Sequence, residues 1–449
     1  MVRAVGRWSL AALMVNLTIG SGIFGLPSRA VALIGQQSPY AFLIAAAGIA
    51  VIAACFAEVA SGFRESGGPY LYTRTAFGRF AGLQTGWLNW ISRLAGNAAS
   101  ANLFTSYLGN FWAPIRTPSL RILTITLLLG ALTAINVRGI KMGAVVSNFF
   151  TLSKLAPLAL FVLCGCVFLM MHGSPVPAVS EAHDLRAWLN CTLLIIFAYT
   201  GWESGLTPAG ETKNPDRDAP WAIFAALAVC APLYVLIQFV VMRTVLQPAA
   251  TESPLAASAA VSGGHALAAT IGLAVVVSTV GFLAAGMIST PRLLFAFAEQ
   301  GDLPRSFAAV HRRYRTPYVS ILIFGGLVWL LAMFGSFSWN AKLSAVSRLI
   351  TYALTCAALP TLRWKKPGLA KFRLPLGPAF AVLSIAFCGI VLSGMGRGEL
   401  IALGVTLAIA LLNWMAVRLQ IDVTGRASAK PASATAVELG EPQRRRTAD

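Results

Sequence analysis

The chain has 449 residues, of which 57% are hydrophobic and 11% are charged, and its mean hydropathy is +0.71. A soluble globular domain carries about 25% charged residues, so this composition excludes an ordinary soluble protein and is typical of a chain that crosses a membrane many times. The net charge of +19 does not indicate nucleic-acid binding, because the basic residues concentrate in alternate loops between apolar segments.

Long apolar runs recur along the whole chain and predict twelve membrane-spanning helices joined by short loops. The N-terminal segment is basic and then apolar, like a signal peptide, but its apolar part continues past position 30, so we expect it to be kept as the first helix. The expected helices are 9–34, 39–63, 83–109, 119–137, 143–171, 187–211, 219–244, 268–297, 317–336, 341–361, 376–395 and 399–418.

The loops between these segments differ in charge. Most of the 35 lysines and arginines fall on the side that would hold both termini. We therefore expect an integral membrane protein with both termini in the cytoplasm, in a plasma membrane or a bacterial inner membrane. The longest loop on the other side is expected at 245–267, and the polar residues 419–449 are predicted to be a disordered cytoplasmic tail.

Two of the apolar segments are interrupted. The first carries NLTIGSGIFGLPS, from Asn16 to Ser28, and the sixth is interrupted at Tyr199-Thr200-Gly201 and again near Pro208. An unwound backbone leaves amides and carbonyls unpaired, so it persists only where it faces protein or a watery cavity. Interruptions at corresponding places in two halves indicate a transport site at the membrane midplane, and an offset of five spans makes the halves inverted.

The interruptions predict a seat for a zwitterion. Where the first helix restarts after Gly22, the amides of Ser21, Gly22 and Ile23 lie at a positive helix end that suits a carboxylate. Where the sixth helix stops, between Phe197 and Thr200, carbonyls lie at a negative end that suits an ammonium group. An α-amino acid carries both groups. The alternative is that the glycines only permit close helix packing, as small residues do in membranes.

Four motifs, in order along nearly the whole chain, resemble the amino acid–polyamine–organocation (APC) transporter superfamily. The resemblance implies an all-α membrane protein with a LeuT-like fold, in which two inverted five-helix repeats with broken helices 1 and 6 are followed by two further helices. It places the repeats at 1–172 and 187–361 and the further helices at 376–418. The motifs are Gly20-Ser21-Gly22-Ile23-Phe24; Ala57-Glu58-Val59 with Arg64-Glu65-Ser66-Gly67-Gly68-Pro69-Tyr70; Phe197 to Pro215, which includes Glu211-Thr212-Lys213-Asn214-Pro215; and Gly301-Asp302-Leu303-Pro304 with Thr316-Pro317.

The resemblance also implies a substrate site. It places the substrate carboxylate on Ser21, Gly22 and Ile23, and it makes an aromatic residue at Phe197 a gate over the bound substrate. Backbone carbonyls near Thr18, Ile19, Phe197 and Thr200 would receive the amino group. Ala198 and Gly201, in the same unwound stretch, are expected to complete the site.

Two ionisable residues inside the spans are candidates for proton coupling, because a charge deep in a membrane costs at least about 2.5 kcal/mol and needs a reason. Lys154 lies near the middle of the fifth segment, where loss of water favours release of its proton. It could carry the proton, stand as a fixed cation in place of sodium beside helices 1 and 8, or reach the surface. Glu203, just past the sixth-helix interruption, could carry a proton or only bond the unwound backbone.

Arg93 lies in the third segment with Asn97, in the part of the helix that faces the substrate side chain in the resembling family. A cation there could favour an anionic side chain or repel cationic amino acids. It could instead pair with a carboxylate such as Glu203. Arg348 in the tenth segment raises the same question and is expected to lie closer to the membrane surface.

These features predict a secondary active transporter for an α-amino acid that works by alternating access and is coupled to protons. The alternatives are an exchanger or a transporter of another small amine, although Arg93 argues against polyamines. An enzyme would need either a nucleophile paired with a base or a metal cluster. A channel would need a filter that is lined by charged groups or by backbone carbonyls. No metal or cofactor is expected, since Cys164 and Cys166 lack a partner pair. The expected partners are the amino acid, protons and lipid.

Overall fold

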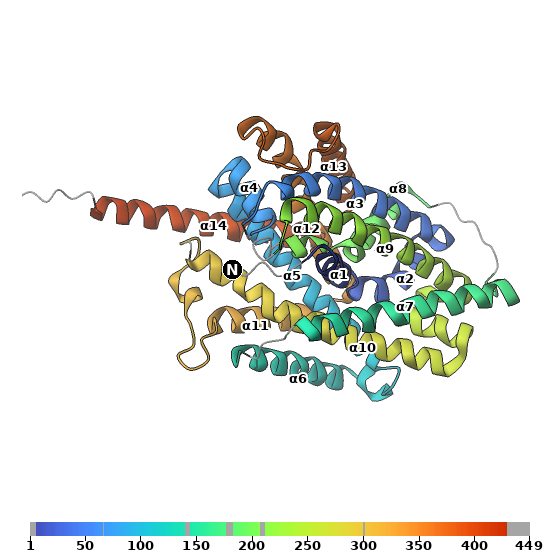
Figure 1. Ribbon diagram of the computed structural model, residues 1–449. Helices are drawn as coiled ribbons and strands as arrows, with labels where there is room; N and C mark the ends of the chain where they lie inside the picture. Colours follow the sequence, from blue (N-terminus) through green and yellow to red (C-terminus); the bar gives the residue numbers. More distant parts are fainter. Residues whose placement is uncertain are drawn as a thin grey trace, which may run out of the picture.

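The computed structural model describes residues 6–65, 67–139, 144–176, 183–206, 212–299 and 301–428, and these residues form helices and connecting segments with no β-strand. The helices pack into one bundle, and the last helix projects from one end of it, which we call the tail end (Figure 1). The α-helices are α1 (Arg7–Thr18), α2 (Ser21–Ile34), α3 (Ser38–Ser61), α4 (Pro69–Phe77), α5 (Arg79–Leu108), α6 (Pro118–Val137), α7 (Ala144–His172), α8 (Leu185–Ile196), α9 (Pro215–Thr244), α10 (Pro254–Glu299), α11 (Tyr318–Phe334), α12 (Phe337–Lys365), α13 (Gly377–Leu392) and α14 (Arg397–Ser428).

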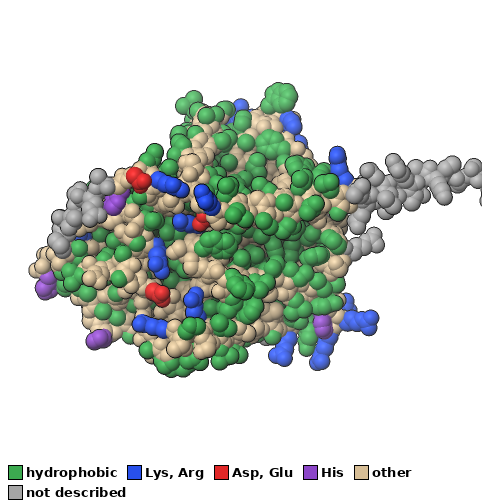
Figure 2. Space-filling model, turned by 180° about the vertical axis from the view of Figure 1, so that it is seen from behind, with side chains coloured by type: hydrophobic (Ala, Val, Ile, Leu, Met, Phe, Trp, Pro, Cys, Tyr) green, Lys and Arg blue, Asp and Glu red, His purple; other side chains and the backbone are tan. Residues whose placement is uncertain are grey.

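The described residues include seven helical stretches that are long and apolar enough to cross a membrane, and α11 and α13 are shorter apolar helices. The most apolar window of α6 is only 17% buried, which means that most of this apolar surface faces outward. An outward-facing apolar helix surface of this kind is unfavourable in water and is stable where it contacts lipid. Figure 2 shows apolar side chains over much of one face, with basic side chains gathered toward its two ends. The predicted all-helical membrane protein is confirmed at this level.

Each predicted apolar segment coincides with a helix or a pair of helical pieces, and the largest differences are these. The short helix α4 was not expected. Residues 254–263 were expected in a loop but form the start of α10, because this alanine-rich stretch favours helix; α10 then changes direction at Gly264, whose φ is +72°. Finally, α14 continues to Ser428, beyond the predicted end of the last helix at 418, and 429–449 lie outside the described residues.

The two interrupted helices lie at the centre of the bundle. α1, α2 and α8 pack among α3, α9 and α12, while α6 and α14 lie at the edge (Figure 1). Aromatic rings surround the sixth-helix interruption: Trp202 packs against Phe56 and Tyr352, and Tyr199 packs against Phe42 and Tyr234. Each such pair contributes about 0.5–1.5 kcal/mol beyond its buried area, so this region is held firmly despite its irregular backbone.

Candidate functional site

The first helix is interrupted at Ile19 and Gly20, as the sequence predicts. The amide of Gly20 turns back to the carbonyl of Thr18, at 2.7 Å, and α2 begins at Ser21, two residues earlier than expected. Ser21, Gly22 and Ile23 therefore form the first turn of α2. Their amides have no acceptor within the helix and lie at its positive end.

The end of α1 leaves its last carbonyls without helical donors, and neighbouring helices supply them. Lys154 of α7 donates its Nζ to the carbonyl of Asn16 at 3.1 Å, and the hydroxyl of Tyr234 in α9 donates to the carbonyl of Thr18 at 3.0 Å. Lys154 is 3% exposed. Its side chain thus lies at the negative end of α1, beside the interruption, and not at the membrane surface.

The sixth helix is interrupted in the predicted place. α8 ends at Ile196, a 3-10 turn covers Phe197–Tyr199, and a second covers Trp202–Leu206. Between them, Thr200 and Gly201 are non-helical, and Gly201 has a φ of +117°. Pro208, the second predicted interruption, lies outside the described residues.

The two interruptions are in direct backbone contact. A Cβ placed on Gly22 would lie 2.6 Å from the Cα of Ala198, and one placed on Gly201 would lie 2.2 Å from the carbonyl oxygen of Leu17. Only glycine allows either approach. The structure therefore brings together the predicted seat residues Thr18, Ile19, Ser21, Gly22, Ile23, Phe197, Ala198, Thr200 and Gly201.

Two of the predicted ammonium acceptors already have donors inside the protein. The carbonyl of Phe197 accepts from the Thr200 hydroxyl at 2.8 Å, and that of Thr18 accepts from Tyr234 and Gly20. The carbonyl oxygen of Phe197 also accepts from the amide of Thr200 at 3.4 Å, so each of these two oxygens has two donors within the protein.

Helix α5 passes beside the seat. The hydroxyl of Ser100 donates to the hydroxyl of Ser21 at 2.8 Å, and one turn away Gly96 faces the ring of Phe197. Phe197 is 6% exposed, and its ring meets that of Phe337 edge-on with the centroids 6.4 Å apart. Asn97, which the sequence places at the substrate, lies against Gly286 of α10 and is 2% exposed.

Glu203 is buried in a network of charged and polar groups. It forms an ion pair with Arg348 of α12, and its Oε2 accepts from the amide of Gly201 and the hydroxyl of Tyr352, both at 2.9 Å. Arg348 also donates its Nε to Ser92 of α5 at 2.6 Å. Arg348 is 6% exposed and contacts the residues of the sixth-helix interruption.

Arg93 does not pair with Glu203, whose partner is Arg348. Among the described residues no carboxylate forms an ion pair with Arg93; its Nε donates to Asn89 at 3.3 Å, and its backbone carbonyl accepts from Asn97. Arg93 is half-buried. Arg93 is thus a cation next to the helices that form the site, and the hydrogen-bond partner of its side chain, Asn89, is neutral.

Sequence reasoning missed several residues of this region. Tyr352 follows Arg348 by four residues, a spacing that puts both on one face of a helix, and Ser92, Gly96 and Ser100 form a small-residue stripe at the same spacing. These patterns could have identified both faces. Nothing local to Tyr234 or Phe337 indicates its role, because each acts across the bundle.

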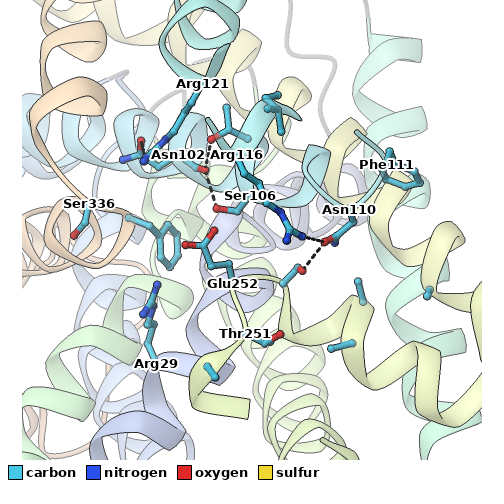
Figure 3. A pocket seen from close by; sticks show the side chains of 18 of the residues that line it. Arg29, Asn102, Ser106, Asn110, Phe111, Arg116, Arg121, Thr251, Glu252 and Ser336 are labelled. Carbon is cyan, nitrogen blue, oxygen red and sulfur yellow. Dashed lines mark hydrogen bonds between the residues drawn. The ribbon is translucent and has the colours of Figure 1, made fainter. Parts of the chain in front are cut away.

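The end of the bundle opposite the tail end contains a cavity of about 980 Å³. Arg29, Arg116, Arg121 and Glu252 line it, and Phe337 is among the residues that bound it (Figure 3).

The tail end is instead held together by ion pairs. Arg64 meets Asp216 at 3.1 Å, Arg79 meets Asp302 at 2.6 Å, and Arg363 meets Glu58 at 2.6 Å. Glu58 also accepts from the amide of Leu374. These pairs join the segment after α3 to α9, α3 to α12, and α5 to the segment after α10.

Comparisons with known proteins agree with this architecture. The model of a family described as amino acid permease matches residues 5–417. Three Bacillus subtilis proteins are similar: the branched-chain amino acid permease BcaP (27% identity, 91% of this chain and 92% of the relative), the methylthioribose transporter (26%, 86% and 87%) and the serine/threonine exchanger SteT (26%, 91% and 94%). The family and these relatives are transporters, not enzymes, and the chain is an integral membrane protein that belongs to the amino acid permease family of the APC superfamily.

Proposed function

We propose that this protein is a secondary active transporter that moves an α-amino acid across the membrane by alternating access, coupled to protons through Lys154. The observation that carries the proposal is the contact between the two interruptions. It sets the open first turn of α2 against the Phe197–Gly201 segment, so that a carboxylate seat and backbone acceptors lie side by side.

The packing of the helices supports the inverted repeats at 1–172 and 187–361, with 376–418 added. Exchange of each span with the span five later maps α3 onto α9, α5 onto α10, α6 onto α11 and α7 onto α12. Contacts follow this exchange: α5 packs on α12 as α10 packs on α7, and α3–α9, α5–α10 and α6–α11 are pairs of exchanged helices in contact. Such packing is what an inverted-repeat transporter needs.

Alternating access requires one end to open while the other is closed. The cavity opposite the tail end and the three ion pairs at the tail end support a state that is open toward the cavity side. With both termini in the cytoplasm, as the charge of the loops favours, this state faces outward. Transport then proceeds by rocking of α1–α3 and α8–α9 against α5, α6, α10 and α11.

Lys154 is the proposed proton carrier because it contacts the carbonyl of Asn16, one turn before the interruption. Loss of its proton would remove a cation from the negative end of α1 and alter the hydrogen bonding of the interrupted helix. Glu203 has a different role in this proposal. Its contacts with Arg348, Tyr352 and Gly201 all favour a carboxylate that stays in place as a fixed charge.

The experiment is a thermal-shift screen in detergent against the twenty amino acids, followed by uptake of each stabilising amino acid into proteoliposomes with and without a pH gradient. We expect accumulation that depends on an inward proton gradient. Absence of stabilisation and uptake for all twenty contradicts the proposal, and uptake that needs a preloaded amino acid but no gradient identifies an exchanger, as the similarity to SteT favours.

The same screen tests the role of Arg93. A half-buried guanidinium with only a neutral partner favours substrates with an acceptor or an anionic group on the side chain. Arg93→Ala should shift the ratio of acidic to neutral to basic amino acids taken up. An unchanged ratio removes Arg93 from the selectivity site.

A further inference from the structure

The segment between α12 and α13, residues 366–376, lies at the tail end and takes no part in the proposed transport site. We call it the α12–α13 link, and we propose that it binds the head group of an anionic phospholipid, with Lys366 and Arg373 on the phosphate. Residues 363–373 contain five basic residues and no acidic one: Arg363, Lys365, Lys366, Lys371 and Arg373. The inference does not depend on which substrate is carried, because it rests on the membrane location and on the contacts of the link.

The link is fixed against the helices beside it. Lys365, in the last turn of α12, donates its Nζ to the carbonyl of Ala76 at the end of α4, at 2.9 Å. The amide of Phe372 donates to the hydroxyl of Ser61 at the end of α3, at 3.0 Å. The basic side chains therefore project from a backbone whose position is set by α3 and α4.

A cavity of about 80 Å³ lies between the link, α3 and α12, and four charged residues line it. Arg363 and Glu58 neutralise each other, because the guanidinium donates to both carboxylate oxygens at 2.6 and 2.7 Å. Lys366 and Arg373 have no ion pair within the described part of the chain. The cavity thus has two uncompensated positive charges, and its volume holds several waters and so one phosphate group.

The backbone of the link adds donors to the same cavity. Lys366 begins a β-turn in which the amide of Leu369 donates to its carbonyl at 3.2 Å, and Gly368 has a φ of +87°. The amides of Gly368 and Ala370, which also line the cavity, donate to no acceptor in the described residues. A phosphate accepts from such amides, from the fork of an arginine and from the ammonium group of a lysine.

Exposed apolar side chains beside these charges favour a phospholipid over free phosphate. Trp364 is 81% exposed and Leu376 is 76% exposed, and they flank the link at the end of α12 and before α13. Val382 and Leu383 continue this apolar surface along α13, at 68% and 57% exposed. Tryptophan is enriched at the level of lipid head groups, and basic clusters next to a membrane helix bind anionic lipids. A phospholipid would cover the apolar surface with its chains while its phosphate occupies the cavity.

The test is native mass spectrometry of the full chain in detergent, titrated with phosphatidylglycerol or phosphatidylcholine. We expect the wild type to bind phosphatidylglycerol more tightly. Lys366→Gln with Arg373→Gln should weaken that binding about tenfold, the effect of two lost charge pairs. The matched control is Arg312→Gln with Arg313→Gln, which removes the same charge from exposed residues of the segment between α10 and α11 and should leave the affinity unchanged.

The remaining outcomes separate a built site from general attraction. Equal loss in the two double variants, or equal affinity for the two lipids, overturns the site. Inorganic phosphate should not displace the lipid at millimolar concentration, and full displacement assigns the cavity to a free anion and overturns the lipid. Lys366→Arg with Arg373→Lys keeps the charge and should keep the affinity, so loss of binding in this variant as well would contradict recognition by charge. Melting temperatures without added lipid confirm that each variant is folded.

Discussion

The two helix interruptions are in contact, but their free backbone groups are satisfied by side chains of opposite charge. At the first interruption, Lys154 and Tyr234 donate hydrogen bonds to carbonyls at the end of α1, while the amides at the start of α2 have no side-chain cap. At the sixth, the carboxylate of Glu203 accepts the amide of Gly201 and is held by Arg348. Glu203 thus supplies at the sixth interruption the anion that a substrate carboxylate would supply at the first. The difference indicates which interruption is open to a ligand.

The largest effect is expected from Gly201→Ala, which would break the contact between the interruptions. A φ of +117° costs a non-glycine residue about 1–3 kcal/mol, and the added Cβ would overlap the carbonyl of Leu17. We expect loss of folded protein by size-exclusion chromatography in detergent. Gly130→Ala in α6, where nothing lies within 4 Å of the new Cβ, is the matched control and should be silent.

The charge pair of the sixth interruption is tested by Arg348→Met. This change leaves Glu203 buried without its cation, and breaking such a pair costs about 3–5 kcal/mol. The melting temperature should fall well below that of the wild type. The double variant Arg348→Met with Glu203→Gln should regain most of the loss, and a double variant no better than the single one would show that the pair is not the cause.

Lys154→Ala removes the cation of the first interruption. Gradient-driven accumulation should be abolished, while exchange of labelled for unlabelled amino acid across the vesicle should survive, because the seat does not include Lys154. Proteoliposomes with and without a pH gradient provide the measurement. Accumulation that persists in the variant would remove Lys154 from coupling.

The smallest effect is expected from Ser100→Ala, which removes the hydrogen bond to Ser21 in the seat. One neutral hydrogen bond contributes about 1 kcal/mol, so KM should rise about fivefold with little change in the melting temperature. Thr270→Ala, which removes an exposed hydroxyl of α10 that bonds only its own helix, serves as the control for loss of a hydroxyl. Equal KM values in the two variants would separate Ser21 from substrate binding.

The sequence identified both interruptions because glycine and threonine in an apolar run are local signals. It also placed Lys154 deep in its span, since depth follows from counting residues. It could not choose between Arg93 and Arg348 as the partner of Glu203, because that choice depends on how α5 and α12 are rotated toward the sixth helix. Depth along a helix does not give rotation about its axis.

The ends of helices were harder to predict than their apolar middles. A membrane limits where apolar residues lie but does not stop a helix, which is why α14 continues to Ser428 and α10 begins at Pro254. The cavity opposite the tail end was also beyond sequence reasoning, since its arginines and Glu252 come from four segments that only the fold assembles.

The ion pairs at the tail end give the protein two faces that respond differently to salt. Arg64 in the pair with Asp216 is 58% exposed, and at physiological ionic strength charges are screened beyond about 8 Å. In the proposed alternating-access cycle, salt on the tail side would weaken these contacts and favour the state open to that side. Salt on the other side would leave them unchanged. A vesicle with unequal salt across its membrane would therefore bias the direction in which this protein prefers to face.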